Sequence, residues 1–144
     1  MQVRDVLKGK GSAVYSMPLD AGVTDAIAKM VQHNIGSLPI VDGENHVVGI
    51  FTERDVLRGT HRDPNGFHGT AIRTVMTHNP VCCNLDDDVH HVMGKMSEYR
   101  VGQLPVLLND QLVGLVSIGD VVKVLYEKVE AENQHLMAYI HGAV

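Results

Sequence analysis

The chain has no tryptophan, and its aromatic residues are limited to four tyrosines and two phenylalanines. It also lacks a basic surplus, because 12 Lys and Arg stand against 17 Asp and Glu, for a formal net charge of -5. Binding of nucleic acid usually needs a basic surface that follows the phosphates, or aromatic rings on which bases stack. We therefore expect no nucleic-acid partner.

Long apolar runs are missing as well. No stretch approaches the roughly 20 apolar residues of a membrane-spanning helix, and the opening MQVRDVLKGKGS lacks the apolar centre of a signal peptide. The only two cysteines, Cys82 and Cys83, are adjacent, so they cannot form the spaced disulfide framework of a small secreted protein. These features predict a cytoplasmic protein in a reducing compartment, with no membrane partner.

Paired metal-ligand spacings are absent too. None of the nine histidines forms a His-x-x-x-His pair and the sequence has no Cys-x-x-Cys, so we predict no metal site. No nucleophile is accompanied by the base and the orienting group that covalent catalysis requires. We predict that the protein is not an enzyme and uses no catalytic cofactor. A nucleotide enzyme that holds a metal through histidine and cysteine is the last-ranked alternative.

What the sequence does contain is an internal repeat within a chain of one domain's length. The chain has 144 residues, of which 44% are hydrophobic and 20% charged, and this is an ordinary globular composition. The repeat has an offset of 66 residues, which becomes 65 after a one-residue deletion in a loop. The matched segments are Leu19-Asp20 with Leu85-Asp86, Leu38-Pro39-Ile40 with Leu104-Pro105-Val106, and Val48-Gly49-Ile50-Phe51-Thr52 with Val113-Gly114-Leu115-Val116-Ser117; ahead of the copies, Val3, Val6 and Leu7 match Ile72, Val75 and Met76.

Each copy has the pattern strand, helix, strand, strand, helix. Apolar residues recur at helical spacing over 23–36 and 89–96, and the runs that follow are β-branched and apolar. Asp42-Gly43-Glu44-Asn45 and Asn109-Asp110 predict two hairpin loops. The predicted strands are 13–16, 37–41 and 47–52 in the first copy and 81–83, 103–108 and 112–117 in the second, and the helices that end the copies are 53–59 and 118–142.

One copy alone would expose an apolar sheet face, which two copies can bury against each other across an approximate two-fold axis. We therefore predict an α/β fold with a single pseudo-two-fold domain over 1–144. Its parts are a first repeat at about 8–59, a polar linker at 60–70, a second repeat at about 71–125 and a C-terminal helix extension at 126–142. Surplus apolar residues on the extension need cover from the N-terminal segment or a second subunit; these are Leu136, Met137, Tyr139 and Ile140.

Each copy contains one turn whose residue types suit either helix capping or ligand binding. It spans Gly49 to Asp55 in the first copy and Gly114 to Asp120 in the second, with the pattern Gly-apolar-x-Thr/Ser-x-x-Asp. In one interpretation the hydroxyl caps a helix and the acid suits the helix dipole, although a capping box favours Glu or Gln and does not explain the glycine. In the other, the helix N-terminus and hydroxyl bind a phosphate while the acid accepts hydrogen bonds from a ribose.

The two turns should not be equivalent, because Arg54 adds a charged donor in the first and Gly119 takes its place in the second. From the residues alone, capping and ligand binding both stay open. The stretch Lys8-Gly9-Lys10-Gly11-Ser12 lacks the full phosphate-loop pattern, so we interpret it as an ordinary loop.

With these motifs in tandem, the chain resembles the cystathionine β-synthase (CBS) domain pairs over residues 1 to about 125. The resemblance implies a disc with two clefts that bind adenosine-containing ligands: AMP, ADP, ATP or NAD, and less expectedly S-adenosylmethionine. It also implies a regulatory role, a homodimer formed through helices, and a protein partner that receives the signal. The alternative is a ligand-free structural or dimerisation module.

Carried over position by position, the family's ribose-binding acid is Asp55 in one copy and Asp120 in the other. Its phosphate-side hydroxyl is Thr52 and Ser117, with Arg54 beside the first and Arg58 and Arg100 as the other nearby cations. The position that often carries a threonine near the base is Ser16 and Cys82, and Cys82 departs from that pattern. The strand-start segments that edge the adenine are Gly36-Ser37-Leu38-Pro39 and Gly102-Gln103-Leu104-Pro105.

Overall fold

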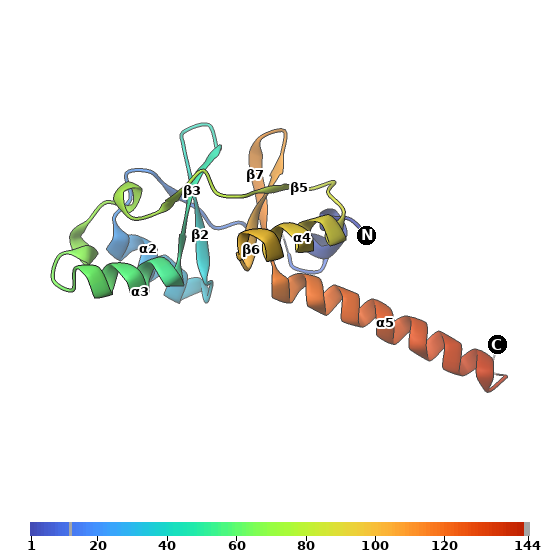
Figure 1. Cartoon of the computed structure of the whole chain (residues 1–144). Coiled ribbons are helices and arrows are strands. Elements are labelled where there is room, and N and C mark those ends of the chain that lie inside the picture. The colour runs from blue at the N-terminus through green and yellow to red at the C-terminus, as the bar shows by residue number, and fades with distance from the viewer. Residues whose placement is uncertain (12, 143–144) are drawn as a thin grey trace.

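Two small β-sheets, each with its own helices, form the centre of the computed structural model, which describes residues 1–11 and 13–142 (Figure 1). The first sheet has the order β1-β2-β3-β4 and the second the order β5-β6-β7. In each sheet a short strand pairs in parallel with the first strand of an antiparallel hairpin. The strands are β1 (Met17–Pro18), β2 (Ser37–Val41), β3 (Val47–Thr52), β4 (Thr77–His78), β5 (Cys83–Asn84), β6 (Gln103–Leu108) and β7 (Gln111–Ser117).

The helices follow the repeat in the same way. Helices α2 and α4 each end at a residue with left-handed backbone, Asn34 with φ 52° and Arg100 with φ 54°. The two-residue loop Asn109-Asp110 has positive φ at both positions, which is the requirement of a tight hairpin turn. The helices are α1 (Val3–Lys8), α2 (Val23–His33), α3 (Glu53–Arg62), α4 (Val89–Tyr99) and α5 (Ile118–Ile140), with short 3₁₀ turns at Phe67–Gly69 and Ile72–Thr74.

The predicted α/β pair is confirmed, but the first strand of each copy was misplaced. The prediction put these strands at 13–16 and 81–83, whereas they lie at Met17–Pro18 and Cys83–Asn84. Pairing with β2 and β6 defines them, through Met17 opposite Ile40 and Cys83 opposite Val106. The residues just before each strand bond a helix lysine instead: Ser16 O accepts from Lys29 Nζ at 2.7 Å, and Cys82 O accepts from Lys95 Nζ at 3.0 Å.

The segments that lead into the two copies are exchanged between the sheets. Val3 and Val6 of α1 are buried in the core of the second sheet, whereas Ile72 and Met76 are buried in the core of the first. A β-bridge between Gln2 and Asp88 anchors the first lead-in beside α4. Each half of the fold therefore combines one copy of the repeat with the lead-in segment of the other copy. This exchange connects the two halves.

This exchange explains the glycine of the repeated turn. A Cβ at Gly49 would collide with Met76 Sδ, and one at Gly114 would lie 2.8 Å from Leu7 Cδ1. Met76 and Leu7 occupy matching places in the two lead-ins, so both glycines leave room for the exchanged segment. The glycine is thus required for packing, and it does not by itself favour a ligand over a capping role.

The stretch predicted as a polar linker contains ordered structure. Helix α3 continues through Thr60 to Arg62. Phe67 is only 2% exposed and belongs to the core of the first sheet, where its ring lies so close to α3 that a Cβ at Gly59 would collide with it. The segment therefore closes one end of the first core as well as connecting the copies.

Helix α5 runs well past the second sheet, and its C-terminal half projects away from the rest of the fold (Figure 1). Its first turns pack on α1, α4 and β7, where Val121 is buried. Within the described residues, none of the helices combines the length and hydrophobicity that crossing a bilayer requires.

Candidate functional site

A cavity of about 650 Å³ opens where α3 begins, and residues from both repeats line it. Strand β3 ends at Thr52 and α3 starts at Glu53, so the end of a strand and the start of a helix meet at its wall. The predicted residues that line it are Gly36, Ser37, Thr52, Arg54, Asp55, Gly102 and Gln103.

The first turn forms a complete capping box. Asp55 N–H donates to Thr52 Oγ1 at 3.2 Å, and Thr52 N–H donates to Asp55 Oδ2 at 2.9 Å. The Thr52 hydroxyl also donates to Asp55 Oδ2, at 3.1 Å. The capping interpretation is therefore correct as far as it goes. Aspartate fills the role for which the sequence rule favours a longer acid, and the same two side chains remain on the cavity wall.

The cavity has an excess of positive charge. Arg54 and Arg58 come from α3, and Arg100 comes from the end of α4 in the other repeat. Against these three guanidinium groups stand the carboxylates of Glu53 and Asp55. The N-terminal N–H groups of α3 add partial positive charge at the same wall, so the cavity can hold an anion.

A buried hydroxyl also lies at this wall. Ser37 is 2% exposed, and its Oγ has no hydrogen-bond partner among the described residues. Buried polar atoms are nearly always satisfied, so an orphaned one needs an explanation. Ser37 pairs with Thr52 across β2 and β3, which places it beside the first turn.

The second turn is built alike but is held differently. Ser117 N–H donates to Asp120 Oδ2 at 2.9 Å, and Asp120 N–H donates to Ser117 Oγ at 3.0 Å. In addition, Lys10 Nζ lies 2.7 Å from the same Asp120 oxygen. Burial raises the pKa of Asp120, but the hydrogen bonds from Lys10 and Ser117 outweigh burial, so its pKa is lowered.

The other predicted residues lie outside the lining of this cavity. Leu38 and Leu104 are fully buried in the two cores, and Pro39 and Pro105 are buried beside them. Ser16 and Cys82 precede the short strands, and Ser117 and Asp120 belong to the second turn. The structure thus brings together the residues of the first turn and the glycine-led starts of β2 and β6.

Sequence reasoning missed the parts of the lining that come from chain segments without a repeated motif. Thr77 and Asn79 follow the second lead-in, and Tyr99 precedes the left-handed end of α4. The repeat could have indicated Thr77 and Asn79, because they follow Met76 as Lys8 and Lys10 follow Leu7. Tyr99 offers no such signal, because its place depends on how α4 packs.

No three His, Cys, Asp or Glu side chains come together as potential metal ligands in residues 1–11 and 13–142. The cysteines are free thiols. Burial raises the pKa of Cys82, and it raises the pKa of Cys83 to about 12. A thiol with such a pKa stays protonated at neutral pH, which disfavours both nucleophilic attack and metal binding.

Known proteins share this architecture. The crystal structure of the CBS-domain protein ATU1752 from Agrobacterium tumefaciens superposes with a TM-score of 0.81 and 32% identity, covering 86% of this chain and 98% of that one. The CBS domain pair of protein MJ0100, in complex with 5-methylthioadenosine and S-adenosyl-L-methionine, gives a TM-score of 0.79 at 28% identity, covering 89% of this chain and 98% of that one.

Sequence comparison agrees with the structural one. A CBS domain-containing protein of Arabidopsis thaliana, CBSX3, mitochondrial, is 34% identical over 148 aligned positions, which cover 97% of this chain and 72% of that protein. The family profile of the CBS domain matches residues 3–61 and again 72–127. The two matches coincide with the two copies of the internal repeat. The chain therefore belongs to the CBS domain family, as a tandem pair of its repeats.

Proposed function

We propose that the chain is a regulatory module that binds an adenine nucleotide or dinucleotide, AMP, ADP, ATP or NAD, in the cavity at Asp55. The observation that carries the proposal is that Thr52, Asp55 and three arginines line one cavity. A carboxylate can accept both hydroxyls of a ribose, while the helix start and the guanidinium groups bind phosphate oxygens. The similar MJ0100 pair is a complex with two adenosine-containing ligands, which supports an adenosine ligand here.

The charge of the cavity favours a phosphorylated ligand. S-adenosylmethionine carries a sulfonium and an ammonium against a single carboxylate, and 5-methylthioadenosine is uncharged, so both gain less than a phosphorylated ligand from Arg54, Arg58 and Arg100. A phosphate would form charge-assisted hydrogen bonds with them, roughly twice as strong as neutral ones. Ser37 adds to the lining a hydroxyl that has no hydrogen-bond partner among the described residues.

The proposal predicts a ranking in a thermal-shift panel. We expect AMP, ADP, ATP or NAD at 1 mM to raise the unfolding temperature by several degrees, because a ligand at about 100 times its Kd adds roughly 2.7 kcal/mol of stability. Adenosine and 5-methylthioadenosine, which lack the phosphate, should give smaller shifts. Raising the salt concentration should weaken the nucleotide shift. A larger shift with S-adenosylmethionine than with every nucleotide would contradict the proposed ligand class.

A structural module is the second candidate. It is favoured by the complete capping boxes and by the packing role of Gly49 and Gly114, which explain the motif without a ligand. It predicts no shift with any adenosine compound in the same panel. The orphaned Ser37 hydroxyl and the arginines from two repeats are what this candidate leaves unexplained.

We also propose that the chain forms a homodimer through α5. Val122, Tyr126, Val129, Leu136 and Ile140 are each more than half exposed and follow one another at spacings of four, three, seven and four residues. These five residues and Asn133 form the α5 stripe. Its successive spacings of four, three, four, three and four residues are the same when read in either direction. A second copy running antiparallel would place Val122 opposite Ile140, Tyr126 opposite Leu136 and Glu127 opposite His135.

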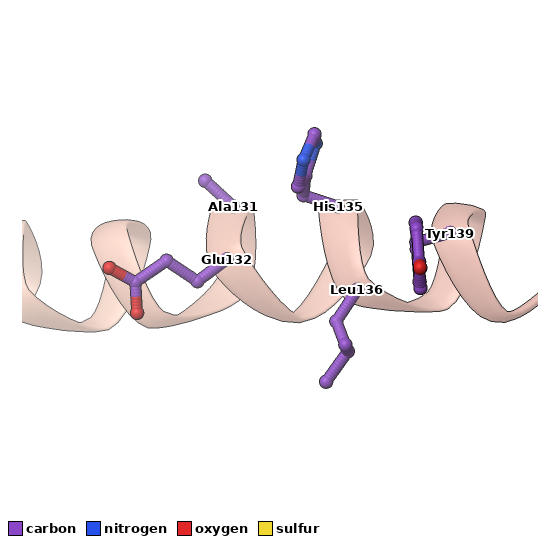
Figure 2. A pocket seen from close by; sticks show the side chains of 5 residues that line it. All are labelled: Ala131, Glu132, His135, Leu136 and Tyr139. Atoms are coloured by element: carbon purple, nitrogen blue, oxygen red, sulfur yellow. The ribbon is translucent and has the colours of Figure 1, made fainter. Parts of the chain in front are cut away.

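An open hollow lies on the C-terminal half of α5 (Figure 2). Ala131, Glu132, His135, Leu136 and Tyr139 line it, and all five belong to α5. Figure 2 shows Leu136 projecting from the opposite side of the helix to Ala131 and His135. Since no second element of the described chain closes the hollow, a neighbouring helix can do so.

The dimer predicts a clear effect of one substitution. Leu136→Glu removes a Leu from both copies of the contact, which should cost about 3 kcal/mol or more and weaken the dimer about a hundredfold or more. Sedimentation velocity over a concentration series measures the change. The control is Gln134→Glu, which adds the same charge to the same exposed helix two residues away and outside the stripe, and should leave the dimer intact. A native protein that sediments as a monomer, or a Leu136→Glu protein that stays dimeric, would exclude this contact.

The signalling step follows from the construction of the cavity. A ligand shifts a conformational equilibrium only by its differential affinity for the two states. The cavity joins α3 of one repeat to the end of α4 in the other, and α4 packs on α5. We propose that closure of the cavity changes the position of α5, which a protein partner senses. The free, protonated thiols suit a reducing compartment such as the cytoplasm.

A further inference from the structure

The two acids of the repeated turn differ in what reaches them. Among the described residues, Asp120 is bound by a lysine from the N-terminal segment, whereas Asp55 is bound only by its own turn. Lys10 Nζ donates to Asp120 Oδ2 at 2.7 Å and to Leu115 O at 2.8 Å. The ammonium therefore has two acceptors, both supplied by the strand and helix that form the second turn.

Lys10 reaches this place because of the repeat. Leu7 packs on Gly114 as Met76 packs on Gly49, so the lead-ins run over the two turns in the same way. Three residues after Met76 the chain has Asn79, which lines the cavity at Asp55. Three residues after Leu7 it has Lys10. A neutral side chain in one copy thus corresponds to a cation in the other.

We propose that Lys10 is a selectivity residue that closes the second turn to adenosine ligands, so that the chain binds one ligand, at Asp55. This rests on the proposed function of the first turn. A ribose binds a carboxylate by donating its hydroxyls. At Asp120 the ammonium of Lys10 already neutralises the negative charge of the carboxylate that would accept them, whereas no cation contacts Asp55 among the described residues. Only 24% of the Asp120 side chain is exposed, so little of it remains for a donor beyond Ser117 N–H and Lys10.

A ligand that displaced Lys10 from the second turn would also lose binding free energy. Its ammonium would leave both Asp120 and the Leu115 carbonyl, and a nucleoside would have to compensate for both contacts. At Asp55 a ribose displaces no cation, because within residues 1–11 and 13–142 the acid accepts side-chain and backbone hydrogen bonds only from Thr52. The difference between the two turns therefore predicts that a ligand occupies them unequally. Lys10 adds to the effect of having Arg54 in the first turn and Gly119 in the second.

The test is the number of AMP molecules bound per chain, measured by isothermal titration calorimetry and native mass spectrometry on the full chain. Lys10→Met keeps most of the aliphatic stem and removes the ammonium. We expect one AMP for the native protein and two for Lys10→Met. Asp55→Asn should bind one AMP with affinity weakened about tenfold to a hundredfold, and the double variant should bind one AMP at the second turn and a second one at this weakened site. Lys8→Met is the matched control, because Lys8 pairs with Asp5 on the surface, and it should bind one.

The outcomes separate the two proposals. Two AMP per native chain, or one per Lys10→Met chain when the native chain also binds one, would overturn the role of Lys10 and leave the first site in place. No AMP on the native chain but one on Lys10→Met would overturn the first site and support Lys10 as the block. No binding by either would overturn both. Thermal unfolding of each variant establishes that it is folded before its binding is counted.

Discussion

Replacing Phe67 by alanine is expected to lower the free energy of unfolding by about 3–5 kcal/mol, the usual range for a buried Phe→Ala change. Phe67 lies in the stretch between the two CBS repeats, where the sequence predicts a polar linker. Its ring is 2% exposed and packs in the first core together with Val23, Ala26 and Ile72. The cavity left by the ring cannot collapse easily, because the turn that carries Phe67 packs against both α2 and α3.

Urea denaturation of the full chain measures this effect, and Asn65→Ala is the matched control. Asn65 is exposed and lies two residues from Phe67 in the same connecting segment. If the segment were a simple linker, both substitutions would change stability by less than about 0.5 kcal/mol, as expected for surface positions. A large loss for Phe67→Ala alone would show that the connection is part of the first core.

The misjudged linker shows what a local sequence pattern can predict. Asp63, Pro64, Asn65 and Gly66 are turn-forming residues, and the structure does place a turn there. A single buried aromatic ring within such a stretch gives no periodic signal. Its burial depends on α2 and α3 coming together, which the sequence pattern does not contain.

The hairpins were predictable because their information is local. Strands β2 and β3 have the predicted bounds 37–41 and 47–52, and the loop Asn109-Asp110 supplies the left-handed residues that a two-residue turn requires. The strands β1 and β5 are two residues long and are defined by their partners, so the prediction missed their position. Repetition in the sequence revealed the pair, but it did not reveal that the lead-ins are exchanged.

The candidate site was predictable to the same extent. Thr52, Arg54 and Asp55 belong to one seven-residue motif, and in the structure all three line the cavity. Lys10 belongs to a segment that the sequence identified only as a loop, and its contact with Asp120 spans 110 positions of the chain. Residue 12, in the same loop, lies outside the described residues.

The largest expected effect on ligand binding is that of Asp55→Asn, which should weaken binding of AMP about tenfold to a hundredfold. Hydrogen bonds to a charged group contribute about 1.5–3 kcal/mol each, and the substitution removes the charge that a ribose diol would bind. Asparagine keeps an oxygen that can accept from Thr52 N–H, just as either an acid or its amide can fill this third helical position of a capping box. Stability should therefore change by less than about 1 kcal/mol while affinity falls.

Asp88→Asn is the control for this prediction, because Asp88 accepts from His90 N–H at the start of α4 and lies outside the cavity lining. It is the same substitution at another helix cap, so it should alter affinity by less than twofold. Titration calorimetry of both variants against native protein, with urea denaturation in parallel, separates capping from binding. An unchanged AMP affinity in Asp55→Asn would assign the acid to the capping box alone, because the carboxylate would then contribute to the helix start and nothing to the ligand.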